Sequence, residues 1–156
     1  MAGTVKPIPD GYHTITPHIV VKGAAEALEF YKKAFGAEEL FRMSGPDGAS
    51  VVHAELKIGD SVLMMCEEFP DMGTKGPAAF GGTPVTMHLY VADTDEAFKR
   101  AVEAGATETM PIQNTFWGDR YGVVTDPFGH QWSIASRIEE LTAEAFAKDA
   151  GCGCDV

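Results

Sequence analysis

The sequence contains no run of about 18 apolar residues, the length that a membrane-spanning helix needs. Its first residues, MAGTVKPIPDG, have neither the basic start nor the apolar stretch of a secretory signal peptide. Cysteine is scarce, because only Cys66, Cys152 and Cys154 occur in 156 residues. This is not the disulfide framework of a secreted protein, so we expect a cytoplasmic protein that does not engage a membrane.

Positive charge is also scarce. Twelve lysine and arginine residues stand against 23 aspartate and glutamate residues, which gives a formal net charge of −11. A protein that binds nucleic acid needs a basic surface to neutralise phosphates, so we expect no nucleic-acid partner. Hydrophobic residues make up 45% of the chain, enough for the core of one compact domain or of two small modules.

The sequence repeats itself at an offset of 70 residues. TPHIVV, which begins at Thr16, returns as TMHLYV, which begins at Thr86. A repeat of this length indicates two modules of the same design. Identical pairs include Thr16 and Thr86, His18 and His88, Val21 and Val91, Glu26 and Glu96, Ala27 and Ala97, and Gly59 and Gly129.

Each copy shows the same order of elements. In the first, the strand pattern TPHIVV precedes a helical pattern that carries Leu28, Tyr31 and Phe35 and ends at Gly36. ELFRM, SVVHAELKI and SVLMMC then alternate as strands do.

The second copy continues from VTMHLYV into the helix DTDEAFKRAVEAG, with Asp93 or Thr94 as its N-cap. A short strand around residues 107–112, DRYGVVT and HQWSIAS follow. The sequence therefore predicts an α+β fold of two βαβββ modules.

The module boundaries follow from these patterns and from a segment rich in proline and glycine. We predict an N-terminal arm over 1–14, a first module over 15–68, a linker over 69–83, a second module over 84–137, and a C-terminal helix and tail over 138–156. For Cys152 and Cys154 we prefer a disordered tail, and a soft-metal site or a disulfide stays open.

Strand side chains alternate between two faces, and one face of each sheet is expected under the helix. Apolar residues such as Ile19, Val21, Ala54 and Leu56 belong to the helix side. The opposite face then receives polar residues from both modules, which gives a polar, concave surface; a merely solvated sheet face is the open alternative. These polar residues are Thr16, His18, His53, Glu55, Thr86, His88, Tyr121, Thr125, Gln131 and Ser133.

The doubled βαβββ order, the phrase EALEFYKKAFGAEE and the phrase RYGVVTDPFGHQWSIA resemble the vicinal oxygen chelate superfamily. That superfamily includes glyoxalase I, extradiol dioxygenases and antibiotic-resistance proteins. Within it the chain resembles the PhnB-like, glyoxalase/bleomycin-resistance-like branch. The resemblance covers residues 15–137 and implies curled mixed sheets around a cavity, usually in a homodimer.

Metal-dependent members of that superfamily place four His or Glu ligands in the cavity, near the start of each module's first strand and on its last strand. The resemblance assigns these positions to Thr16, Leu63, Thr86 and Ser133. None of these side chains is a strong ligand for Zn²⁺, Ni²⁺ or Fe²⁺. We therefore expect no metal cofactor, and the open alternative is a divalent metal at a displaced site of His18, His53, Glu55 and His88.

We predict that the protein binds a drug or metabolite in the manner of bleomycin-resistance proteins. The predicted ligand-binding residues are His18, His53, Glu55, His88 and Tyr121, with Trp117 and Arg120 at the rim. For Trp117 and Arg120, interface packing and an Arg120–Asp ion pair remain the alternative. We also expect Met64 and Met87 in the core and Met65 in the pocket.

Two other functions stay open. One is a metal-dependent lyase, isomerase or dioxygenase of glyoxalase type, or an enzyme that uses His53 and Glu55 as an acid–base pair. The other is a module whose acidic surface docks a partner protein.

Overall fold

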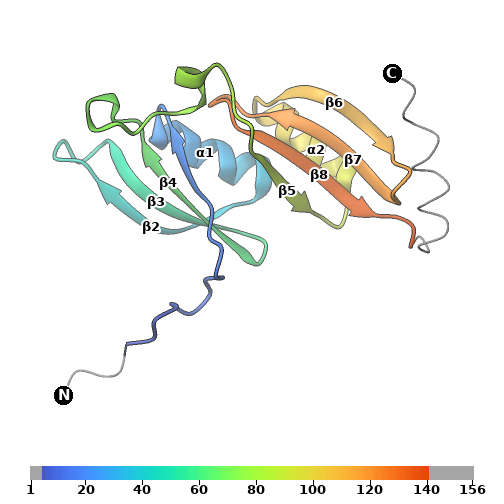
Figure 1. The fold of residues 1–156 in the computed structure, drawn as a ribbon, viewed down its shortest axis with the longest axis horizontal. Coiled ribbons are helices and arrows are strands. Elements are labelled where there is room, and N and C mark those ends of the chain that lie inside the picture. Colours follow the sequence, from blue (N-terminus) through green and yellow to red (C-terminus); the bar gives the residue numbers. More distant parts are fainter. Residues whose placement is uncertain (1–4, 141–156) are drawn as a thin grey trace. The chain divides into compact units, whose positions relative to one another are not determined.

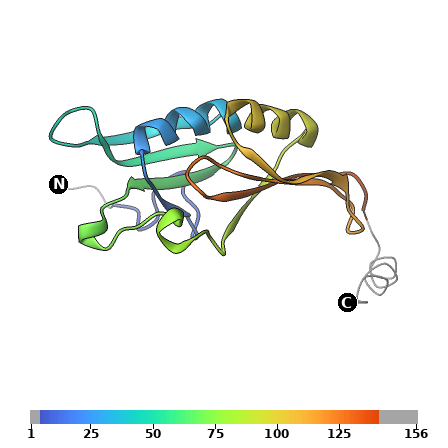
Figure 2. The same ribbon diagram turned by 90° about the horizontal axis from the view of Figure 1, so that it is seen from above.

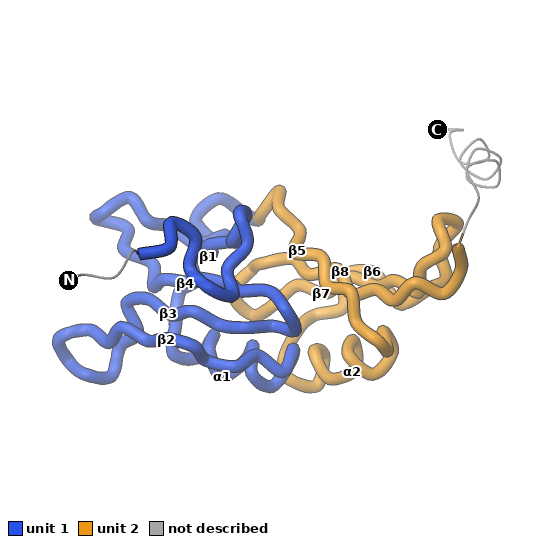
Figure 3. The backbone as a smooth tube through the Cα atoms, turned by 90° about the horizontal axis from the view of Figure 1, so that it is seen from below, with its two compact units in different colours: residues 1–82 blue, residues 83–156 orange. Residues whose placement is uncertain are grey.

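The computed structural model describes residues 5–140. The chain divides into two compact units, Met1–Gly82 and Thr83–Val156 (Figure 3). Among the described residues, no helix is long and apolar enough to cross a membrane. The predicted C-terminal helix and the tail with Cys152 and Cys154 fall largely outside the described residues.

Unit 1 is a four-stranded sheet with one α-helix (Figure 1). The strands lie in the order β1-β4-β3-β2, with β1 parallel to β4 and the other pairs antiparallel. Two short 3-10 helices, Pro70–Met72 and Pro77–Phe80, occupy the predicted linker. The elements are β1 (His18–Val21), α1 (Ala24–Phe35), β2 (Glu38–Ser44), β3 (Val51–Ile58) and β4 (Ser61–Glu67).

Unit 2 repeats this arrangement in the strand order β5-β8-β7-β6, with β5 parallel to β8. The predicted fold class, two βαβββ modules with mixed sheets, is confirmed, and both sheets are open. The elements are β5 (Thr86–Tyr90), α2 (Thr94–Ala104), β6 (Thr107–Asn114), β7 (Asp119–Thr125) and β8 (Gln131–Arg137).

Each helix covers one face of its own sheet (Figure 2). In unit 1 the buried helix residues Leu28 and Tyr31 belong to the same core as Leu56 of β3. In unit 2, Phe98 lies against β7 at Gly122, where a Cβ atom would be 2.8 Å from the Phe98 ring. A side chain at position 122 would therefore push the helix off the sheet.

The start of α1 depends on a residue from the sheet. Its N-cap, Gly23, has no side chain to offer, and Glu67 at the end of β4 takes over that task. Glu67 Oε1 accepts from Gly23 N at 2.9 Å, and Oε2 accepts from Ala24 N at 2.7 Å. α2 instead uses its own N-cap, Asp93, which accepts from Glu96 N at 3.0 Å. A long-range contact thus fixes α1 to β4.

The hairpin between β3 and β4 is one residue shorter than its counterpart in unit 2. Leu56 pairs with Leu63, seven residues on, whereas Val124 pairs with Trp132, eight residues on. The repeat offset of 70 residues between the two units therefore does not hold for β4. Because strand side chains alternate, a shift of one residue moves every side chain of the strand to the opposite face.

The sequence-based placement of the β4 side chains was wrong for this reason. Leu63 and Met65, 5% and 0% exposed, lie in the core, whereas Met64 lies on the open face in register with His18. Met64, not Leu63, is the counterpart of Ser133, and Met65 is not a pocket residue.

We predict that Glu67→Ala lowers the free energy of unfolding by about 1–2 kcal/mol, because two N–H groups at the start of α1 lose their acceptor. Chemical denaturation measures this loss. The matched control is Glu26→Ala, which removes an exposed acid from the first turn of the same helix and should cost less. Equal losses in the two variants would contradict a capping role for Glu67.

Candidate functional site

The open face of unit 1 brings together three of the predicted ligand-binding residues. His18 and His53 meet edge to face, with ring centroids 5.4 Å apart. His53 Nε2 lies 3.5 Å from Glu55 Oε1. Across the strands, Met64 is in register with both His18 and Glu55. The alternation of strand side chains explains this cluster, because all four point away from α1.

The described chain before β1, residues 5–17, forms an arm that extends past the predicted bound of residue 14 and lies on the same face. Its Tyr12 hydroxyl donates a hydrogen bond to Glu55 Oε2. Pro17 is held to the sheet edge, where its carbonyl accepts from Met64 N at 2.9 Å. Between arm and sheet is a cavity of about 390 Å³, lined by Pro7, Ile8, Pro9, Tyr12, His13, Thr14, Thr16, Glu55 and Met64. No role was predicted from the sequence for Tyr12 or for the other lining residues that precede Thr16.

Two groups on this face have shifted pKa values. Burial lowers the pKa of His18, and the neighbouring His53 lowers it further. The pKa of Tyr12 is raised, first because its hydroxyl donates to Glu55, and then by burial and the negative charge of that carboxylate.

We predict that His18 titrates below the ordinary histidine value of about 6.5. His53→Ala should move the His18 pKa upward without restoring that value, because burial, the larger cause, remains. NMR titration of the imidazole resonances measures both. Since the folded pKa is lowered, His18 opposes folding increasingly as the pH falls from about 6.5 to its folded pKa. A His18 pKa at or above 6.5 would contradict this prediction.

The positions that the resemblance assigned to metal ligands do not fit a catalytic metal. With the β4 register corrected, they are Thr16, Met64, Thr86 and Ser133. Hydroxyls and a thioether are weak ligands for Zn²⁺, Ni²⁺ and Fe²⁺. Within residues 5–140, no three His, Cys, Asp or Glu side chains are grouped so that they could hold a metal ion.

The open face of unit 2 carries a row of rings. His88 Nδ1 lies 2.7 Å from Ser133 Oγ, and its ring stacks on Tyr121 with centroids 6.2 Å apart. Tyr90 meets His88 at 4.5 Å, and Trp117 meets Tyr121 at 5.6 Å, both edge to face. Three predicted ligand-binding residues, His88, Trp117 and Tyr121, are therefore neighbours.

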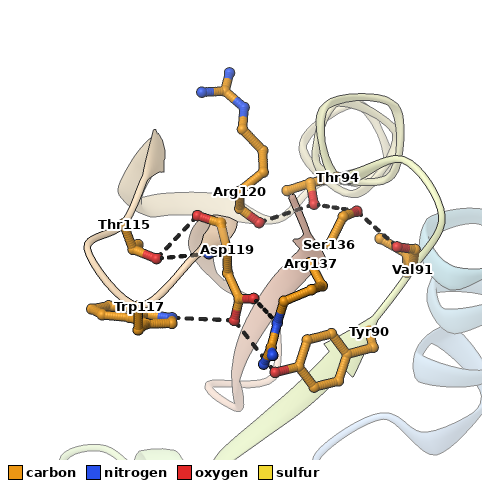
Figure 4. A network of polar contacts seen from close by, with 9 residues as sticks. All are labelled: Tyr90, Val91, Thr94, Thr115, Trp117, Asp119, Arg120, Ser136 and Arg137. Atoms are coloured by element: carbon orange, nitrogen blue, oxygen red, sulfur yellow. Dashed lines mark hydrogen bonds and ion pairs between the residues drawn. The ribbon is translucent and has the colours of Figure 1, made fainter. Parts of the chain in front are cut away.

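A buried carboxylate holds two of these rings (Figure 4). Asp119 is 2% exposed. Its Oδ2 accepts from Trp117 Nε1 at 3.2 Å and from Tyr90 Oη at 3.3 Å, and its Oδ1 accepts from Arg137 Nε at 2.9 Å. Asp119, Tyr90 and Arg137 were not predicted as site residues.

Arg120 lies on the other side of the unit 2 sheet. Its Nε and Nη2 donate to the two carboxylate oxygens of Asp95 in α2, at 2.9 and 2.7 Å. Figure 4 shows its side chain directed away from Trp117 and Asp119. Neighbouring residues of a strand face opposite ways, so Arg120 does not join Tyr121. The predicted alternative, an Arg120–Asp ion pair, is what the structure contains, and the ligand-binding role of Arg120 stays a prediction.

We predict that Asp119→Asn lowers the free energy of unfolding by about 1–3 kcal/mol, because an amide cannot accept from all three donors. The Trp117 indole N–H resonance should shift as well. The control is Asp95→Asn, which breaks an exposed Arg pair and should cost much less. Thermal or chemical denaturation with NMR measures both, and similar losses would contradict an organising role for Asp119.

The chain is similar to known proteins over most of its length. The model of the Glyoxalase/Bleomycin resistance protein/Dioxygenase superfamily matches residues 11–134. An uncharacterized protein of Mycobacterium tuberculosis is 48% identical over 133 residues, which cover 83% of this chain and 78% of that protein.

Solved structures share the fold. An X-ray structure of an Arabidopsis thaliana gene product is 29% identical with a TM-score of 0.64, covering 80% of this chain and 98% of that chain. The crystal structure of TioX from Micromonospora sp. ML1 is 26% identical with a TM-score of 0.63, covering 83% and 100%.

Proposed function

Because the chain belongs to the glyoxalase/bleomycin resistance protein/dioxygenase superfamily, we propose that it binds a small organic molecule on the open face of unit 1. The observation that carries the proposal is the cavity of about 390 Å³ between the arm and the sheet. Ligand sites in proteins have volumes of roughly 300–1,000 Å³ and combine apolar walls with a few polar groups. Here Pro7, Ile8 and Met64 provide apolar wall, and Glu55 and Thr16 provide polar groups.

The side chains at the predicted metal-ligand positions favour binding without a metal. Thr16 and Met64 flank the cavity at positions where metal-dependent relatives would carry strong ligands, and neither is one. This agrees with the drug- or metabolite-binding members of the superfamily and with the PhnB-like branch that the sequence resembles. A homodimer, which the resemblance implies, and a cytoplasmic location, which the composition favours, are part of the proposal.

Turnover on the same face is the second candidate. His53 Nε2, 3.5 Å from Glu55 Oε1, is close enough for the two groups to share a proton through a small adjustment. A glyoxalase-type lyase, isomerase or dioxygenase with a relocated metal would instead need His18, His53 and Glu55 to converge with a further ligand. Turnover that appears only with added Zn²⁺, Ni²⁺, Mn²⁺ or Fe²⁺, and disappears in His53→Ala, would favour this candidate.

We predict that small organic fragments shift the NMR resonances of residues 7–16, Glu55 and Met64, and that Met64→Trp abolishes these shifts by filling the cavity. The experiment screens a fragment library against the full-length chain by two-dimensional NMR. The matched control is Met72→Trp, because Met72 is 81% exposed and outside the cavity. Fragments that bind Met64→Trp as well as the unchanged protein, or that shift only other residues, would overturn the proposal.

A further inference from the structure

We infer that the ligand of this cavity is an organic cation, with a protonated amine or quaternary ammonium next to Glu55 and an apolar body under the arm. The inference rests on the proposed function and adds the charge of the ligand to it. It is carried by the surroundings of Glu55, the apolar lining and the acidity of the chain.

Glu55 lacks the kind of partner that other shielded carboxylates of this chain have. Its side chain is 19% exposed, and its partners are the Tyr12 hydroxyl and His53 Nε2 at 3.5 Å. Between residues 5 and 140, no Lys or Arg forms an ion pair with it. An imidazole is charged only when protonated, so His53 is not a permanent counter-ion.

Three other carboxylates show the contrast. Asp119, 2% exposed, pairs with Arg137 at 2.9 Å. The Glu39 side chain, 25% exposed, pairs with Lys32 at 2.9 Å and with Arg42 at 2.8 Å. Glu67 accepts from two backbone N–H groups at the start of α1. A carboxylate withdrawn from water needs such partners, and Glu55 faces a cavity in which a ligand can supply one.

The remaining lining suits the body of such a ligand. Pro7, Ile8, Pro9 and Met64 are apolar, and Tyr12 adds an aromatic ring, a group whose face attracts cations. None of the nine lining residues is a lysine or arginine. An anionic ligand would therefore meet Glu55 without a compensating charge. The formal net charge of −11 also attracts cations to the protein over longer distances.

The test compares three probes with one body: 4-phenylbutylamine, 4-phenylbutanol and 4-phenylbutyrate, which are cationic, neutral and anionic at neutral pH. Dissociation constants are measured by NMR titration of the full-length chain. We expect the amine to bind about ten-fold more tightly than the alcohol, and the carboxylate to bind most weakly. Higher NaCl concentration should reduce the preference for the amine.

Glu55→Gln keeps the size and an acceptor for Tyr12 but removes the charge, so amine and alcohol should bind it equally. The matched control is Glu38→Gln, which removes the same net charge from an exposed position of β2 and should preserve the preference. A wild-type protein that binds the alcohol or the carboxylate as tightly as the amine overturns the inference and leaves the proposed function standing.

If none of the three probes binds, the charges of the compounds that bind in the fragment screen decide whether the inference stands. Hits without an excess of cations overturn the inference alone. No hits at all overturn the proposed function with it.

Discussion

Each four-stranded sheet has one helix, and a single helix covers only one face of a sheet. Because strand side chains alternate, the covered face collects apolar residues such as Leu56 and Trp132, and the other face is left for polar ones. The cluster around Glu55 in unit 1 and the cluster around His88 in unit 2 both lie on those uncovered faces. Burial of the apolar face stabilises the folded unit. The side chains of the open face are the ones that remain available for contacts.

The two units have the same fold, but different groups of residues lie on their open faces. In unit 1 the N-terminal arm lies along the face, and Glu55 lines the open cavity between arm and sheet. Unit 2 fixes a row of rings with one buried carboxylate, Asp119, which accepts from Trp117, Tyr90 and Arg137. A carboxylate at 2% exposure is tolerated because all of its donors are present at once, and these hydrogen bonds position Trp117, Tyr90 and Arg137 at this end of the unit 2 face.

The sequence predicts the elements well because alternation and helical spacing are local patterns. It failed on β4, since a hairpin shorter by one residue exchanged the faces of Met64 and Met65. It also missed contacts between distant residues: Tyr12 lies 43 positions from Glu55, and Tyr90 lies 29 positions from Asp119. For Asp119 a signal was available, because it stands two residues before Tyr121 on the same strand and therefore on the same face.

The surroundings of Met64 connect the superfamily fold to the chemistry proposed for this chain. In metal-dependent relatives, the last strand of a module provides a strong ligand at the corresponding position, and a thioether cannot replace it. Backbone pairing holds β1, β4 and β3 in register on this face. Glu55, directly across from Met64 on β3, places a carboxylate on this face. In the function proposed above, recognition on this face depends on this carboxylate of β3 and not on a metal held by β4, and a carboxylate selects its ligand by charge.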